Sequence, residues 1–212
     1  MIVINFKNYK FREQSLKLAE KIRKFLPNAI ICPAAIDIEA LAKKTKLKVF
    51  AQSADIENTT RSTGYNTLTA LKKAGASGTL INHSEHPISI TNIRKMFIIS
   101  KKLKMKIIVC TSNLKETKRI ILLKPWAIAF EDPKLVGSGN SITEYKSKDV
   151  SKFSQMLKKT KIIPLCGAGI STAEDIKQAK ALGCKGVLIS SAIANSKNPS
   201  KLLKQIASLK QK

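Results

Sequence analysis

A carboxylate at the end of an apolar run, followed by a loop with two glycines, is the part of this chain best suited to chemistry. Residues 126–142 read WAIAFEDPKLVGSGNSI, and residues 126–130 have the length and composition of a buried strand. Glu131 stands where that run ends, and residues 136–140 show neither a helical nor a strand period. A general base beside a mobile loop that grips an anion would need these parts in this order, although a surface glutamate ahead of an ordinary loop gives the same pattern.

The rest of the chain alternates apolar, strand-like runs with amphipathic, helix-like segments. The strand-like runs are residues 2–6, 29–32, 49–51, 79–82, 106–110, 127–130, 162–166 and 186–189. The helix-like segments are residues 15–26, 38–44, 67–74, 90–103, 114–122, 150–157, 172–182 and 200–209. Such alternation predicts parallel strands joined by helical crossovers, and short, continuously apolar strands suit burial on both faces. No G-x-G-x-x-G motif favours an open doubly wound sheet, so the sequence predicts an α/β fold, one eight-stranded parallel barrel domain over residues 1–212.

A barrel of this kind places its functional groups just after the C-terminal ends of the strands. Small and polar residues gather at those positions in the sequence: Asn5, Lys7, Gln52, Asn82, His83, Glu131, Gly167, Ala168, Gly169, Ser190 and Ser191. A lysine, a histidine and a glutamate after three different strands would not often arise by chance. The sequence therefore predicts an active site at this end of the barrel.

The charge balance is strongly basic, with 39 Lys and Arg against 14 Asp and Glu and a net charge of +25. Only five of the basic residues are arginine, the lysines are spread over all the helical segments, and aromatic residues make up 5% of the chain. Dedicated readers of nucleic acids usually use arginine forks and aromatic stacking platforms. We therefore expect non-specific nucleic-acid binding at low salt and attraction of small phosphorylated substrates, but no specific nucleic-acid partner.

The remaining composition argues against several other classes of protein. The four cysteines have no C-x-x-C or metal-ligand spacing, which favours buried structural residues and predicts no metal site. No apolar run approaches the roughly 20 residues that a membrane span needs. The first residues show no export signal, so a cytoplasmic location and no membrane association are expected.

The ordered motifs along the chain resemble the triosephosphate isomerase family in its short archaeal form, and they cover almost the whole sequence. The motifs are NFKNYK (5–10), AQSAD (51–55), TGYN (63–66), NHSEHP (82–87), KIIVCTSN (106–113), FEDPKLVGSGNSI (130–142), CGAGIST (166–172) and GVLISSAI (186–193). Each motif alone is weak, but the ordered set is specific. The resemblance implies a TIM barrel that interconverts dihydroxyacetone phosphate and glyceraldehyde 3-phosphate without a cofactor or metal.

The resemblance also implies roles for the three chemically active residues. Glu131 would be the base that removes a proton from the carbon next to the carbonyl group. His83 would be a neutral electrophile and proton shuttle, and the SEHP that follows it looks like a helix start that would disfavour the imidazolium. Lys7 would stabilise the developing oxyanion, with Asn5 supporting Lys7 and donating a hydrogen bond to the substrate.

Phosphate binding is expected from backbone N–H groups, and other positions are expected to support the site. The candidate substrate-binding residues are Asn5, Lys7, Val136, Gly137, Gly167, Ala168, Gly169, Ser190 and Ser191. Glu85 and Ser84 are supporting residues, and His86 is an outer residue. The family pattern is broken by Asp132 in place of a proline, by Lys134 and Ser138 in the lid, and by the Ser190-Ser191 pair in place of two glycines.

The loop containing Thr63 and Gly64 matches the segment with which family members contact a neighbouring subunit. A homo-oligomer is therefore expected, a tetramer rather than a dimer. Two other functions stay open on the sequence. One is a different phosphate-binding barrel enzyme, such as an aldolase, in which Lys7 would form a Schiff base, or a biosynthetic isomerase. The other is a basic nucleic-acid-associated barrel, whose binding would persist at moderate salt.

Overall fold

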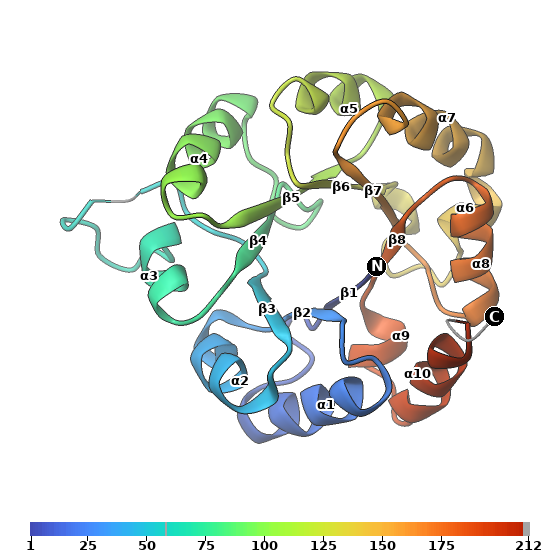
Figure 1. Cartoon of the computed structure of the whole chain (residues 1–212), viewed down its shortest axis with the longest axis horizontal. Coiled ribbons are helices and arrows are strands. Elements are labelled where there is room, and N and C mark those ends of the chain that lie inside the picture. Colours follow the sequence, from blue (N-terminus) through green and yellow to red (C-terminus); the bar gives the residue numbers. More distant parts are fainter. Residues whose placement is uncertain (58, 210–212) are drawn as a thin grey trace.

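The chain folds into a closed barrel of parallel strands surrounded by helices, as the sequence predicts (Figure 1). A computed structural model describes residues 1–57 and 59–209; position 58 and residues 210–212, which the predicted domain includes, lie outside the described residues. The strands are β1 Ile2–Asn5, β2 Ile30–Cys32, β3 Lys48–Ala51, β4 Gly78–Ile81, β5 Lys106–Thr111, β6 Ala127–Glu131, β7 Ile163–Gly167 and β8 Gly186–Ile189. Each strand pairs with the next in sequence, and β8 pairs with β1 to close the barrel.

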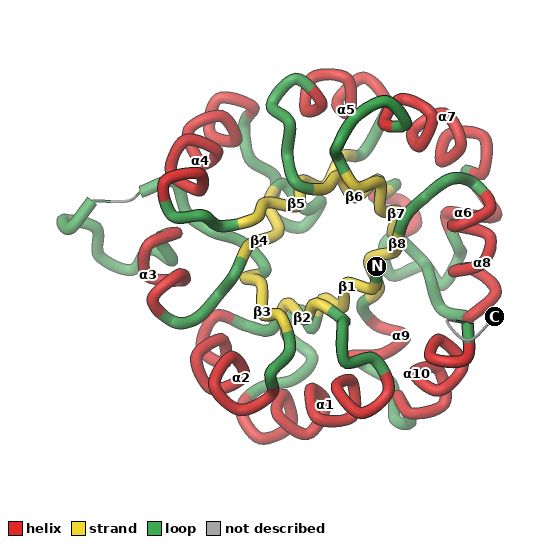
Figure 2. The backbone as a smooth tube through the Cα atoms, viewed as in Figure 1, coloured by secondary structure: helices red, strands yellow, loops and turns green. Residues whose placement is uncertain are grey.

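Helices form the outer ring, which Figure 2 shows around the strands. The longer ones are α1 Arg12–Phe25, α2 Ile38–Thr45, α3 Leu68–Lys73, α4 Ile90–Lys102, α5 Leu114–Ile121, α7 Ser147–Leu157, α8 Ala173–Ala181 and α10 Pro199–Ser208. All eight predicted helical segments are confirmed. The sequence analysis missed the one-turn helices α6 Ile142–Tyr145 and α9 Ser191–Ala194 and the 3₁₀ turns η1 Ala35–Asp37 and η2 Pro133–Leu135, which are too short to show a period.

The core has two layers, and this explains why the strands are apolar throughout. Side chains inside the barrel form one cluster, whose members include Val3, Phe50, Leu80, Ile108 and Leu188. The second and larger cluster fills the space between the strands and the surrounding helices. Because neighbouring residues on a strand face opposite sides, both positions must be apolar when both sides are buried.

The same alternation directs functional groups into the mouth of the barrel. Ala127 and Ala129 on β6 belong to the inner cluster, so Glu131, the next residue of that parity, also faces inward. On β7, Leu165 is an inner residue, so Gly167 occupies the corresponding inward position. Glu131 and Gly167 are register partners, which places the glutamate side chain beside a residue that has none.

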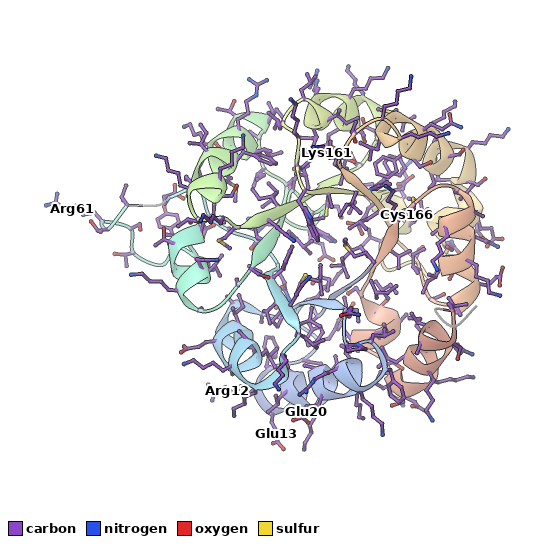
Figure 3. All side chains as sticks on the ribbon, viewed as in Figure 1. Arg12, Glu13, Glu20, Arg61, Lys161 and Cys166 are labelled. Carbon is purple, nitrogen blue, oxygen red and sulfur yellow. The ribbon has the colours of Figure 1, made fainter. Side chains whose placement is uncertain are left out.

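One loop projects away from the ring of helices. The segment between β3 and α3 extends outward in Figure 1, and Arg61 lies at its far end in Figure 3. Its base is closed by a hydrogen bond from the Asp55 N–H to the Asn66 carbonyl at 3.0 Å. Tyr65, which precedes Asn66 near the base, is 48% exposed. Among the described residues, no helix is both long and apolar enough to span a membrane.

Candidate active site

Glu131, His83 and Lys7 come together at the C-terminal mouth of the barrel. They line one pocket of about 570 Å³, and the Glu131 Oε2 and His83 Nε2 atoms are 3.7 Å apart. Both side chains are buried, whereas the Lys7 side chain remains 16% exposed. A carboxylate and an imidazole at this separation leave room for a small substrate atom to approach both.

Most of the residues expected to bind substrate line the same pocket. These are Asn5, Lys7, Val136, Gly137, Ala168, Gly169, Ser190 and Ser191. The sequence analysis did not identify six other lining residues: Tyr9, Gly139, Ile170, Ser171, Leu188 and Ile189. All six lie within two or three residues of a predicted site residue, so proximity along the chain was the only signal for them. Gly167, Ser84 and Glu85 do not line this pocket.

Burial sets the protonation behaviour of Glu131. Its side chain is 7% exposed, and Oε2 has no hydrogen-bond partner among the described residues. Burial raises the pKa of the Glu131 carboxyl above its usual value, because the charged form loses hydration. The buried thiol of Cys110 on β5 interacts with the carboxylate and lowers that pKa in part. Burial and the neighbouring Glu131 also raise the pKa of the Cys110 thiol, so the sulfur keeps its proton.

Removing this thiol tests its influence on the carboxylate. We expect Cys110→Ala to raise the pKa of Glu131 further, because an interaction that favours the charged form is lost. A base works only when deprotonated, so the acidic limb of the kcat/KM profile should move to higher pH. Rate measurements across the acidic range provide the test, with Cys184→Ala as the matched deletion of another buried thiol. An unmoved acidic limb would show that the thiol does not act on the base.

Hydrogen bonding fixes the tautomer of His83. The backbone N–H of Glu85 donates to His83 Nδ1 at 3.1 Å, so Nδ1 is an acceptor and carries no proton. A neutral ring then holds its proton on Nε2, the nitrogen nearer to Glu131. The predicted helix start directly after His83 is wrong, because residues 84–86 form a turn and α4 begins at Ile90 with Ser89 as its cap. The donor to His83 Nδ1 is therefore a single backbone N–H in that turn and not the N-terminus of a helix.

Lys7 is held in place by Asn5 at the end of β1, by Gln52 after β3 and by an acid. Its backbone has a φ of 44°, which turns the chain sharply after β1, and its N–H donates to Asn5 Oδ1 at 2.9 Å. Gln52, after β3, donates to the Lys7 carbonyl at 2.8 Å. The ammonium group pairs with Glu85 at 2.6 Å. Asn5 therefore contacts Lys7 as expected, and Glu85 contacts both Lys7 and His83.

Turns in the backbone shape the part of the pocket suited to a phosphate. Ala168 and Gly169 have consecutive positive φ values of 74° and 71°, so the backbone turns sharply where it lines the pocket. Ser190 Oγ is buried without a partner among the described residues, so its hydroxyl is free to donate. The N-terminus of α8 is already occupied, since Asp175 accepts hydrogen bonds from the N–H groups of Ser171 and Thr172.

The segment that follows Glu131 is anchored at both ends. Asp132 accepts a hydrogen bond from the Lys134 N–H at 2.9 Å and pairs with Lys146 at 3.6 Å, so it ties the start of the segment to the end of α6. At the other end, the Ile142 N–H donates to the Ala168 carbonyl at 3.1 Å. Between these anchors, Gly137 and Gly139 have positive φ values and line the pocket. The segment therefore has fixed ends, and between them a central part with two glycines in the left-handed conformation.

Comparison with known proteins agrees with this geometry. The sequence model of the family described as triosephosphate isomerase matches residues 1–208. The triosephosphate isomerase of Methanobrevibacter smithii is 34% identical over 98% of this chain and 97% of its own, and that of Methanocaldococcus jannaschii is 33% identical over 97% and 98%.

A solved structure supports the fold independently. The crystal structure of triosephosphate isomerase from Bartonella henselae superimposes with a TM-score of 0.74 over all of this chain and 98% of that one. Its sequence identity is 17%, so this likeness concerns the architecture alone. The archaeal relatives and the family match extend over nearly the entire sequence, and the chain belongs to the triosephosphate isomerase family.

Proposed function

We propose that this chain interconverts dihydroxyacetone phosphate and glyceraldehyde 3-phosphate as a single catalytic domain, with Glu131, His83 and Lys7 as its reacting groups. The observation that carries the proposal is the 3.7 Å separation of the Glu131 carboxylate and the His83 ring in a pocket that also holds the Lys7 side chain. The reaction moves one proton between adjacent carbons and a second between their oxygens. The reaction therefore needs a base that acts on carbon next to an acid that acts on oxygen.

Glu131 acts on the carbon atoms. The carboxylate removes a proton from the carbon next to the carbonyl group and returns it to the neighbouring carbon. Its raised pKa makes it a stronger base than an exposed glutamate, because burial has stripped the charged form of water. The unpartnered Oε2 faces the imidazole and needs no bond broken before it reacts.

His83 and Lys7 act on the oxygen atoms. The His83 Nε2–H donates to the substrate carbonyl and can then exchange a proton between the two oxygens of the enediolate. The Lys7 ammonium lies beside the charge that develops there and stabilises it electrostatically. Glu85 pairs with Lys7 and donates its N–H to His83, so one residue orients both groups.

The phosphate would be held by the turn that contains Ala168 and Gly169, by the Ser190-Ser191 segment and by Gly137 in the lid. These residues line the side of the pocket formed by β7, β8 and the segment after β6. Backbone N–H groups suit a phosphate because they add no side chain that must be ordered on binding. Closure of the lid would exclude water from the enediolate and prevent loss of its phosphate.

A homo-oligomer, a tetramer rather than a dimer, is part of the same proposal. The projecting loop between β3 and α3 carries Thr63 and Gly64 and exposes Tyr65, as a segment that enters a neighbouring subunit would. Contacts between subunits must offset the repulsion of a +25 charge on each chain. Light scattering at moderate salt measures the mass, and a monomer would contradict this part of the proposal.

The direct test is a coupled assay of triose phosphate isomerisation with the purified wild-type chain, without added cofactor or metal. We expect turnover in both directions. A folded but inactive protein would contradict the proposal and favour either another phosphate-binding barrel enzyme or a nucleic-acid-associated barrel. Trapping of dihydroxyacetone phosphate on Lys7 by borohydride would then indicate aldolase chemistry. Nucleic-acid binding that persists at moderate salt would indicate the non-enzymatic function.

A further inference from the structure

We propose that Asn82 and Glu116 form a positioning pair that orients the His83 ring for proton transfer. The inference rests on the proposed role of His83 and adds two residues that do not touch the substrate pocket. Asn82 comes directly before His83 at the end of β4, and Glu116 lies in the first turn of α5. Neither side chain is needed for the chemistry itself.

The backbone at Asn82 determines which way His83 faces. Leu80 is an inner residue of β4, so strict alternation would turn residue 83 toward the helices. Asn82 instead has a φ of 58°, a left-handed conformation that interrupts the alternation and brings His83 to the pocket wall. Asparagine and aspartate adopt this conformation more easily than other residues with a side chain.

The Asn82 side chain then closes the loop that carries His83. Its Oδ1 accepts a hydrogen bond from the Ile88 N–H at 3.1 Å, so residues 82 and 88 are tied together across the loop. Inside the loop, the His86 N–H donates to the His83 carbonyl at 2.7 Å. The Glu85 N–H that sets the imidazole tautomer belongs to the same loop. A displacement of the Asn82 side chain would therefore move the loop and, with it, the His83 imidazole.

Glu116 fixes the other end of the Asn82 side chain. Asn82 Nδ2 donates to Glu116 Oε1 at 2.7 Å and to the Cys110 carbonyl at 2.9 Å. Glu116 Oε2 accepts hydrogen bonds from the N–H and hydroxyl of Ser112, at 2.7 and 3.0 Å. Both carboxylate oxygens are thus engaged, and the pair joins the loop after β4 to the loop after β5.

Hydrogen bonds are needed here because packing alone leaves this side open. A second cavity of about 550 Å³ lies next to the substrate pocket, and Asn82, Cys110, Glu116 and Glu131 are among its lining residues. Cys110 contributes its carbonyl to Asn82 and its thiol to Glu131. Cys110 therefore contacts both Glu131 and Asn82, the residue that orients His83.

Asn82→Asp is the main test. Aspartate tolerates the left-handed conformation, but it replaces the Nδ2 donor by an oxygen facing Glu116 Oε1 and the Cys110 carbonyl. We expect kcat to fall by about 10- to 100-fold, since a displacement of about 1 Å can cost that much. KM should change little, because the phosphate-binding turns lie on other strands. A loss confined to KM or to thermal stability would overturn the positioning role.

A compensating change in Glu116 makes the test specific. In Asn82→Asp/Glu116→Gln, the glutamine amide can donate to Asp while its oxygen still accepts from Ser112. We expect the double variant to recover most of the lost kcat. In Glu116→Gln alone, the new amide nitrogen must face either Asn82 Nδ2 or the Ser112 N–H, which are both donors. We therefore expect this single variant to lose activity mildly. Additive losses in the double variant would contradict a direct pair. Asn113→Asp is the control, since it makes the same change in the neighbouring loop after β5 and keeps the α5 cap.

A spectroscopic measurement separates this proposal from the proposed function. The chain has two histidines, so ¹⁵N-histidine labelling gives two rings, and His86→Gln identifies the signals of His83. In the substrate-free wild type we expect an unprotonated Nδ1 and a protonated Nε2. Glu116→Gln keeps Asn82 and should fold, and we expect it to shift the His83 signals toward a mixture of tautomers. Unchanged signals would reject the positioning pair whether or not His83 takes part in catalysis.

Discussion

Glu131→Gln is expected to lower kcat by at least about a thousandfold, equivalent to ~4 kcal/mol of activation free energy. Glutamine keeps the shape of the side chain and its place at the end of β6, but it cannot accept the proton from carbon. Substrate binding should persist, because the proposed phosphate-binding turns follow β7 and β8. The coupled isomerisation assay measures kcat and KM together. Wild-type turnover that survives the substitution would remove Glu131 from its proposed role.

Thermal unfolding of the same variant distinguishes lost chemistry from lost structure. Burial raises the pKa of Glu131, so the folded state holds the proton more tightly than the unfolded state does. Below the ordinary value of 4.5 both states are protonated, and glutamine and glutamic acid should then be about equally stable. As the pH rises above that value, the wild type loses stability until it passes the folded-state pKa.

The Glu131→Gln variant is therefore expected to melt at a higher temperature than the wild type at neutral pH, with the difference disappearing in acid. Calorimetry at both pH values provides the measurement. An inactive protein that is also less stable at neutral pH would point to a structural role instead. A stable and inactive protein would show that the buried charge is kept for its chemistry at a cost in stability.

The sequence predicted the barrel because its strands are buried on both faces. Continuous apolar runs and amphipathic helices alternate eight times along the chain, and a closed barrel accounts for this count better than an open doubly wound sheet. The short helices α6 and α9 escaped prediction, since one turn contains no repeat. Ser191, which the sequence predicts only as a substrate-binding residue after the last strand, is also the first residue of α9.

Side-chain chemistry was easier to predict from the sequence than the backbone that supports it. Glu131, His83 and Lys7 follow strand ends and meet in one pocket, as a barrel requires. The sequence contains serines at both 84 and 89, and composition alone could not decide which one caps α4. The structure selects Ser89, whose hydroxyl accepts from the Asn92 N–H at 3.2 Å. The turn before it depends on the left-handed backbone of Asn82.

Gly167 shows why some functional positions stay hidden in a sequence. The sequence predicts it to be a substrate-binding residue in the Gly-Ala-Gly motif. In the structure it is the last residue of β7, lies outside the substrate pocket and is the register partner of Glu131. Its function depends on a neighbour 36 positions earlier on another strand, and no local pattern records that contact.

Gly167→Ala is expected to lower kcat by about a hundredfold without unfolding the protein. A Cβ at this position would lie 2.7 Å from Glu131 Oε1, closer than a Cβ atom can approach, and 3.2 Å from the Glu131 Cδ, which is a tight contact. The φ of Gly167 is not positive, so alanine adopts the backbone without strain and the clash falls on the carboxylate. A displacement of the base by about 1 Å accounts for a loss of this size. KM should change little, since Gly167 does not line the substrate pocket.

A shorter base provides the matched test of this clash. Glu131→Asp withdraws the carboxylate from the space that the new methyl group would take, and by itself it should reduce kcat because the base no longer reaches the substrate. In the Gly167→Ala background the further loss caused by Glu131→Asp should be much smaller than in the wild type, because the methyl group has already displaced the longer base. Assays of the four proteins give the coupling free energy directly. Losses that simply add would mean that the alanine acts elsewhere, for example on the Leu188 carbonyl, which its Cβ would approach to 3.1 Å.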